Sequence, residues 1–177
     1  AELIKSLVEH MDGCLGVVFP TFEEYPNRKG KNEIVSYIPD NKNFSYTVDD
    51  LECFFEDKDI KALLLVNPDN PSGNFISKKD LLLLAKWSRE RRIRLIVDES
   101  FVDFTVEYKN NSLLSNEILE TNTNLIVMKS ISKSYGVPGA RLGVLATSDK
   151  DLIRWMKKDV AIWNINSFGE FYMQIFG

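Results

Sequence analysis

Apolar positions along the chain follow two different spacings, and the two alternate. Short continuous apolar runs are typical of strands that are buried on both faces of a sheet. Such runs occupy residues 16–19, 34–38, 61–66, 94–97, 124–128 and 142–146. Apolar residues at helical spacing predict helices at residues 3–11, 48–55, 81–87, 149–159 and 168–176. The alternation predicts an α/β domain built on a mostly parallel sheet.

Two of the predicted helices carry start signals. Thr47 is followed three residues later by Asp50, a variant of the capping box, and Ser77 is followed by Asp80 at the same spacing. We therefore expect helices to begin directly after Thr47 and Ser77.

Size, charge and cysteine content exclude several classes of protein. The chain has 177 residues, 44% hydrophobic and 27% charged, which fits one globular domain. The net charge is −4 and the two signs are interspersed, so we expect no nucleic-acid partner. The longest apolar runs fall far below the roughly 18 residues that cross a bilayer, so we expect no membrane partner. Cys14 and Cys53 form neither a metal pair nor a disulfide framework, so we expect no metal site and a cytoplasmic location.

Both ends of the sequence indicate a piece of a longer protein. Helical spacing starts at Leu3 with no capping residue before it. At the other end an apolar stripe from Phe168 to Phe176 finishes the sequence with nothing left to cover it. We therefore expect further chain on both sides.

Three of the predicted strands are each followed directly by a polar segment. These segments are residues 67–73 (Asn-Pro-Asp-Asn-Pro-Ser-Gly), 98–101 (Asp-Glu-Ser-Phe) and 130–135 (Ser-Ile-Ser-Lys-Ser-Tyr). In an open α/β sheet, ligands bind beyond the carboxyl ends of the strands. The pattern predicts that all three segments meet at one edge of the sheet.

Each segment by itself has a plainer interpretation. Residues 67–73 suit a tight turn, Asp98 could cap the next segment, and a single Lys133 suits a solvated surface. An Asn, an Asp and a Lys at successive strand ends, with Arg141 eight residues further on, is not a combination that turns and surface charges produce. The set therefore favours a binding site.

The combination resembles the fold-type I, pyridoxal-phosphate-dependent aminotransferases of class I/II. The sequence resembles in particular histidinol-phosphate aminotransferase and threonine-phosphate decarboxylase. The similarity rests above all on residues 130–143, which match the family's Ser-x-Ser-Lys motif and the Gly-x-Arg-x-Gly that follows it. The resemblance implies a three-layer sandwich with helices on both faces of the sheet, and pyridoxal 5'-phosphate (PLP) as cofactor.

Two residues are implied to be catalytic. Lys133 matches the lysine that holds the cofactor as a Schiff base and then shuttles the substrate proton. Asp98 matches the carboxylate that pairs with the pyridine nitrogen and keeps it protonated. Asn70 matches the donor to the cofactor's phenolic oxygen. The resemblance thus assigns both catalytic residues to cofactor binding as well.

Further cofactor contacts are implied around the phosphate and the ring. Arg141, Ser130 and Ser132 match phosphate ligands, for which a guanidinium fork and short hydroxyls are suited. Residues 1–2 (Ala1 and Glu2) resemble the end of the family's phosphate-cupping turn, where backbone N–H groups at a helix start would hold the phosphate. Phe22 falls where the family places an aromatic ring over the pyridine, although an ordinary core position is the alternative.

Substrate contacts are predicted at Tyr25, Trp163 and Asn164. One position departs from the common pattern, because Asp98 is followed at the third place by Phe101 where aminotransferases of this group have a Tyr. The hydroxyl that would bond the phenolic oxygen is therefore missing. The segments at residues 98–104 and 163–167 look more like the decarboxylase branch.

The resemblance implies that residues 1–177 form a single, incomplete large domain. The N-terminal segment and the C-terminal small domain, with its carboxylate-binding arginine, would lie outside it, so this piece alone is expected to be inactive. The complete enzyme is expected to be a homodimer. It would transfer an amino group between a small amino acid, with or without a phosphate, and a 2-oxo acid. The alternatives are a decarboxylase of threonine-phosphate type and a non-catalytic folding or dimerisation module.

Overall fold

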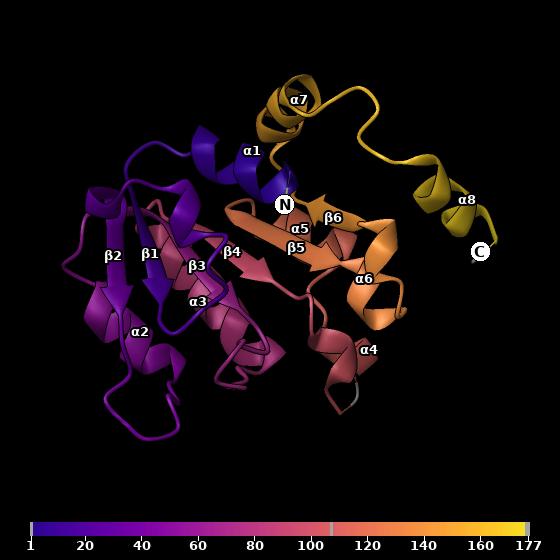
Figure 1. Ribbon diagram of the computed structural model, residues 1–177. Helices are drawn as coiled ribbons and strands as arrows, with labels where there is room; N and C mark the ends of the chain where they lie inside the picture. The colour runs from indigo at the N-terminus through magenta and orange to yellow at the C-terminus, as the bar shows by residue number, and fades with distance from the viewer. Residues whose placement is uncertain (1, 107, 176–177) are drawn as a thin grey trace.

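The computed structural model describes residues 2–106 and 108–175, and these form one sheet between two layers of helices (Figure 1). The strand order is β2-β1-β3-β4-β5-β6, with parallel pairing throughout except for antiparallel β5 and β6. The strands are β1 (Cys14–Val18), β2 (Ile34–Tyr37), β3 (Ile60–Val66), β4 (Arg94–Asp98), β5 (Leu125–Ser130) and β6 (Gly143–Ala146). The mostly parallel α/β sheet expected from the apolar pattern is confirmed.

The helices fill the connections between strands. They are α1 (Glu2–His10), α2 (Val48–Phe55), α3 (Lys78–Glu90), α4 (Tyr108–Asn111), α5 (Asn116–Thr121), α6 (Ile131–Ser134), α7 (Lys150–Asp159) and α8 (Ser167–Ile175). Single 3-10 turns are η1 (Pro26–Arg28), η2 (Lys31–Glu33), η3 (Val102–Phe104) and η4 (Pro138–Ala140). The apolar pattern did not predict the short helices α4, α5 and α6, because a helix of one or two turns has too few positions to show periodicity.

One face of the sheet is covered by α2, α3 and α5. Leu51 and Phe55 of α2, Leu84 of α3 and Leu119 of α5 join the apolar side chains of β3, β4 and β5 in one core. Both predicted capping residues stand where the sequence placed them. The hydroxyls of Thr47 and Ser77 accept hydrogen bonds from backbone N–H groups three residues further on, at 3.3 and 3.2 Å.

The opposite face is covered by α1 and α7. Leu7 and Val8 of α1 and Leu152 and Met156 of α7 lie in a second core against the other sides of the same strands. The central strands are therefore buried from both sides, and all residues of β3 except Lys61 are buried. This explains why their sequences are nearly continuous apolar runs rather than alternating ones.

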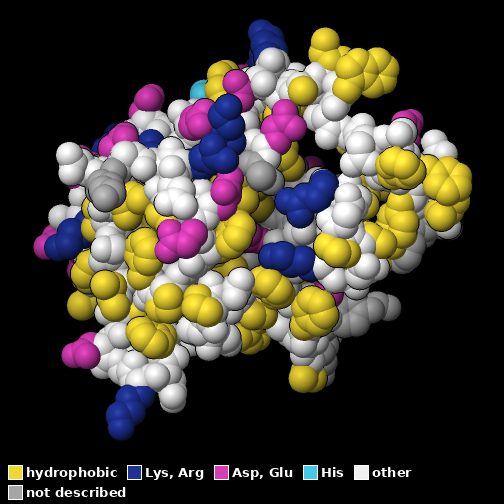
Figure 2. Space-filling view, viewed as in Figure 1, with side chains coloured by type: hydrophobic (Ala, Val, Ile, Leu, Met, Phe, Trp, Pro, Cys, Tyr) yellow, Lys and Arg dark blue, Asp and Glu magenta, His cyan; other side chains and the backbone are white. Residues whose placement is uncertain are grey.

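The α7–α8 connection and α8 extend away from the sheet at one edge (Figure 1). Helix α8 is attached at Asn166, whose side-chain amide donates to Ala140 O at 2.9 Å. Gly169 lies so close to Leu142, the residue before β6, that a Cβ atom there would come within 2.9 Å of Leu142 Cδ2. Large apolar side chains along this arm face solvent, as Figure 2 shows at its upper and right edges.

Candidate functional site

The three polar segments singled out from the sequence lie at one edge of the sheet. Strands β3, β4 and β5 are neighbours in register, with Val66 opposite Asp98 and Asp98 opposite Met128. Because the strands are parallel, their carboxyl ends fall side by side. The loop after β3, the turn after β4 and helix α6 after β5 therefore surround a common space.

Asp98 ends β4 in a buried position, with hydrogen bonds to both of its carboxylate oxygens. Its side chain accepts three hydrogen bonds: from the Tyr25 hydroxyl at 2.7 Å, from the Ser100 backbone N–H at 2.9 Å, and from the Ser100 hydroxyl. The residue is only 6% exposed. Donors placed on both carboxylate oxygens compensate a buried negative charge. The structure thus holds an anion at a fixed place under the site.

Tyr25 is placed differently from the sequence-based expectation. It was expected to contact substrate, but it is completely buried and its hydroxyl donates a hydrogen bond to Asp98. Burial, followed by the charge of Asp98 and the hydrogen bond to it, raises the pKa of Tyr25 well above its ordinary value, so the phenol stays protonated and donates. We reassign Tyr25 from substrate contact to partner of Asp98.

Lys133 lies on α6 and directs its amine at two aromatic rings. Its Nζ is 4.0 Å from the centre of the Phe101 ring and 5.8 Å from the centre of the Phe22 ring. Partial burial lowers the pKa of Lys133, and the charge of Asp98 opposes this effect. A lowered pKa leaves more of the amine unprotonated at neutral pH, which is the nucleophilic form.

Phe22 stands at the surface of the site and not in the core. It is 42% exposed, and its ring meets the Tyr25 ring edge to face with centroids 6.1 Å apart. The alternative that Phe22 is an ordinary core residue is therefore wrong. The exposed part of its ring is available to a ligand.

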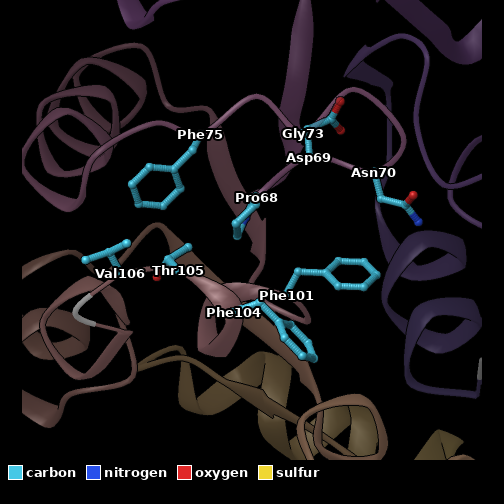
Figure 3. Close-up of a pocket in the computed structure, with 9 residues that line it drawn as sticks. All are labelled: Pro68, Asp69, Asn70, Gly73, Phe75, Phe101, Phe104, Thr105 and Val106. Carbon is cyan, nitrogen blue, oxygen red and sulfur yellow. The ribbon is translucent and has the colours of Figure 1, made fainter.

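Asn70 and Phe101 line a cavity of about 580 Å³ between the loop after β3 and the segment after β4. In Figure 3 the Asn70 side chain and the Phe101 ring extend toward the same end of this cavity, while Phe75 and Val106 lie at the other end. No hydrogen bond engages the Asn70 side chain within residues 2–106 and 108–175, so its amide is available. Asn67 closes the loop instead, through two hydrogen bonds to the backbone of Ile76 at 2.8 and 2.9 Å.

The residues expected to bind phosphate separate into two groups. Arg141 is exposed, and in the described part of the chain no carboxylate pairs with its guanidinium. Ser130 is half-buried at the end of β5, and its backbone N–H donates to the Ser100 hydroxyl at 2.9 Å. Ser132 differs, because its buried hydroxyl accepts from the Leu142 N–H at 2.9 Å and donates to the Leu142 carbonyl at 3.3 Å. We reassign Ser132 from phosphate ligand to a link between α6 and the residue before β6.

The remaining predicted site residues lie at the chain ends. Ala1 is outside the described residues. Glu2 begins α1 and is exposed, and its carboxylate accepts a hydrogen bond from the Ala161 N–H at 3.0 Å. Trp163 and Asn164 lie in the α7–α8 connection and face solvent, with Trp163 91% exposed. The structure does not bring these two side chains into the space around Asp98 and Lys133.

Sequence reasoning missed the residues that hold the site together. Ser100 bridges Asp98 and Ser130, and Asp103 forms an ion pair with Lys129 at 2.7 Å. These contacts join segments about 30 positions apart, with no local pattern to reveal them. Within the described residues, no cluster of three or more His, Cys, Asp or Glu side chains could hold a metal ion. No helix in residues 2–106 and 108–175 is long and apolar enough to span a membrane.

A comparison with protein families gives one match over most of the chain. Residues 17–173 fit the model for aminotransferase class I and II. The chain belongs to this family. Members of the family and its solved structural neighbours use PLP as cofactor.

Individual relatives include both decarboxylases and aminotransferases. The L-serine phosphate decarboxylase of Sulfurospirillum multivorans is 34% identical over 99% of this chain and 45% of its own length. A solved decarboxylase from the same organism superposes with a TM-score of 0.83 at 31% identity, over 99% of this chain and 50% of that one. The histidinol-phosphate aminotransferase of Buchnera aphidicola is 29% identical over 93% of this chain and 44% of its own length. The chain thus spans less than half the length of both curated relatives.

Proposed function

We propose that this chain is the cofactor-holding part of the large domain of a PLP-dependent enzyme. The observation that carries the proposal is the pairing of a fixed buried anion with a partly buried amine. Asp98, at the end of β4, is hydrogen-bonded to Tyr25 and Ser100. The Lys133 amine, on the helix that follows the neighbouring strand β5, lies against the Phe101 ring. The enzyme itself would be longer than residues 1–177, cytoplasmic and homodimeric.

The donor set fits PLP. Asp98 offers a carboxylate to a protonated ring nitrogen, and the available amide of Asn70 would donate to the phenolic oxygen. Arg141 and the Ser130 hydroxyl would hold the phosphate, and Phe22 would cover a ring face. When bound, PLP supplies an aldehyde that condenses with amines and a ring that accepts electrons from the substrate carbon.

The side chains of this chain would divide the remaining work. Lys133 would bind the cofactor and move a proton to and from the substrate carbon, for which an amine of lowered pKa is suited. Asp98 would hold a proton on the ring nitrogen, with Tyr25 and Ser100 keeping the carboxylate in place. Phe22 and Phe101 would exclude water from the Lys133 amine.

Decarboxylation of a small phosphorylated amino acid is the reaction that we favour. The similarity to the L-serine phosphate decarboxylase, at 34% identity, supports it. Phe101 supports it as well, because the site lacks the tyrosine hydroxyl that the aminotransferase pattern has at this position. Transamination with a 2-oxo acid is the second candidate, supported by the similarity to histidinol-phosphate aminotransferase.

Two measurements on the full-length protein test the proposal. After incubation with PLP and reduction with borohydride, peptide mapping should find the pyridoxyl label on Lys133. Labels scattered over surface lysines would instead support a non-catalytic module. With phosphoserine or phosphothreonine as substrate, a decarboxylase releases CO2 and a phosphorylated amine and needs no 2-oxo acid. A transaminase needs the 2-oxo acid and converts it to an amino acid.

A further inference from the structure

Helix α6, which carries Lys133, is too short to orient that side chain by itself. It has four residues, Ile131–Ser134, which is about one turn. Isolated helices of this length are unstable, because nucleation costs more than a single turn recovers. The direction of the Lys133 amine must therefore be set by contacts that α6 makes with the rest of the molecule.

Two serine hydroxyls make such contacts on either side of Lys133. Ser132 is bonded to the backbone of Leu142, as described above. The hydroxyl of Ser134 donates to one carboxylate oxygen of Asp103, in η3. The turn is thus held at one side by the residue before β6 and at the other by the segment that follows Asp98.

The Asp103 carboxylate is itself fixed by a cation. Its other oxygen lies 2.7 Å from the Nζ of Lys129, at the end of β5. The two side chains are 15% exposed for Lys129 and 23% exposed for Asp103, so solvent screens this pair less than a surface pair. Asp103 therefore joins three elements: η3, the end of β5 and the last residue of α6.

A second bridge runs parallel to the first. The Ser100 hydroxyl donates to Asp98 and accepts from the Ser130 N–H. Through Ser100 and Asp103, the segment at residues 98–104 is tied to the segment at residues 129–134 at two points. Asp98 and Lys133 lie on these two segments, so the bridges set the position of one relative to the other.

We propose that Asp103 is a positioning residue that, paired with Lys129, anchors Ser134 and thereby aims the Lys133 amine into the site. The inference rests on the proposed function, because it assigns Asp103 a role in presenting Lys133 to PLP. Asp103 itself touches neither Lys133 nor the residues that would hold the cofactor. Its effect would pass through the orientation of α6.

The test compares variants by the share of pyridoxyl label that reaches Lys133 when the full-length protein is reduced with borohydride at limiting PLP. Asp103→Ala should lower that share by roughly tenfold, which corresponds to about 1.4 kcal/mol. Ser134→Ala should lower it in the same direction while leaving the Lys129 pair in place. Asp103→Asn should recover part of the loss, because an amide oxygen can still accept from Ser134.

Arg94→Gln is the matched control for a merely structural effect. Arg94 pairs with Asp149 at 3.1 Å, with 39% and 25% exposure, and joins β4 to the start of α7 far from α6 in sequence. This variant should lower the melting temperature without changing the share of label on Lys133. If Asp103→Ala fails to fold, the share of label in Ser134→Ala tests the positioning role by itself, because this variant removes only one hydroxyl.

The outcomes separate this inference from the proposed function. If the wild type is labelled at Lys133 and the share of label on Lys133 is the same in Asp103→Ala and Ser134→Ala, the positioning role is refuted. The proposed function is then unaffected. A control variant that loses as much label as Asp103→Ala would also refute the positioning role. Absence of label from Lys133 in the wild type would overturn the proposed function itself.

Discussion

The ends of β4 and β5 lie side by side, yet their side chains are held in opposite ways. At the end of β4, Asp98, Glu99 and Ser100 are 6%, 1% and 4% exposed, and hydrogen bonds engage all three side chains. After β5, Arg141 is exposed, and Lys133 is exposed although its amine lies beside the Phe101 and Phe22 rings. There the protein fixes the turn of α6 through Ser132 and Ser134 and pairs Lys129 with Asp103, but it leaves Lys133 and Arg141 without an ion pair in the described residues.

The difference matches what each group would have to do. A carboxylate that stabilises a ring proton must stay in one place, and burial with several donors achieves this. An amine that forms and breaks bonds must move, and an arginine that meets a phosphate must be reachable. The carboxylate of Asp98 is therefore held in the interior, while the amine of Lys133 projects from the short helix α6.

The largest effect expected on the open side follows from Lys133→Ala. The full-length protein should lose turnover by about 10²–10⁴-fold, the range for removal of a proton-transferring group. It should still bind PLP without a covalent bond, because Asn70, Ser130 and Arg141 remain. Steady-state kinetics and the cofactor's absorbance after gel filtration measure the two effects. Lys86→Ala, an exposed lysine on α3, should behave as wild type; turnover within tenfold of wild type for Lys133→Ala would refute the assignment.

On the buried side, Asp98→Asn should be nearly as damaging. Asparagine keeps the shape and can still accept hydrogen bonds, but it carries no charge to hold a proton on the ring nitrogen. We expect a loss of about 10²–10³-fold in kcat, comparable to removing one preorganised electrostatic contact. The exposed Asp57→Asn serves as control. A change of less than fivefold in kcat for Asp98→Asn would mean that Asp98 only caps the segment after β4.

Tyr25→Phe tests whether the buried carboxylate depends on its most distant partner. The variant leaves one oxygen of Asp98 without its donor, so the free energy of unfolding should fall by about 1.5–3 kcal/mol, as for hydrogen bonds to charged groups. Urea unfolding followed by circular dichroism measures this. Tyr37→Phe is the control, because in the described residues no hydrogen bond engages the Tyr37 hydroxyl. Equal stability of the two variants would contradict the Tyr25–Asp98 bond.

The smallest effect concerns the aromatic ring beside the open amine. A ring face near a cation stabilises the charged form by about 0.5–1 kcal/mol at exposed sites. Leucine keeps an apolar side chain beside the amine but has no ring face, so Phe101→Leu should lower the pKa of Lys133 further. Without PLP, the amine should react about two to five times faster with acetic anhydride. The increase in reaction rate should be present below the pKa of Lys133 and should vanish at high pH, where the amine is neutral in both proteins.

Mass spectrometry of the Lys133 peptide across pH follows this reaction. Phe104→Leu is the matched control, since Phe104 neighbours Phe101 with ring centres 6.3 Å apart but does not face the Lys133 amine. Slower reaction in Phe101→Leu would show that the ring shields the amine more than it stabilises the cation.

The sequence by itself determined the elements and the chemistry offered at their ends. Apolar runs located all six strands. The central strands are buried on both faces and need apolar side chains at nearly every position, whereas the edge strands β2 and β6 have apolar runs although they are only partly buried. Thr47 and Ser77 located two helix starts, because a cap acts within one turn. The order of polar segments after β3, β4 and β5 also placed Asn70, Asp98 and Lys133 at one edge, since parallel strands share it.

Only the tertiary structure decided how those side chains are held. Tyr25 reaches Asp98 across 73 positions of sequence, and Ser134 reaches Asp103 across 31. Tyr25 and Ser132 do not have the roles expected from the sequence. In the folded chain the Tyr25 hydroxyl is hydrogen-bonded to Asp98 and the Ser132 hydroxyl to the backbone of Leu142. Periodicity and capping report on a residue's neighbours along the chain. The partners of a buried hydroxyl or carboxylate depend on which strands become neighbours in space.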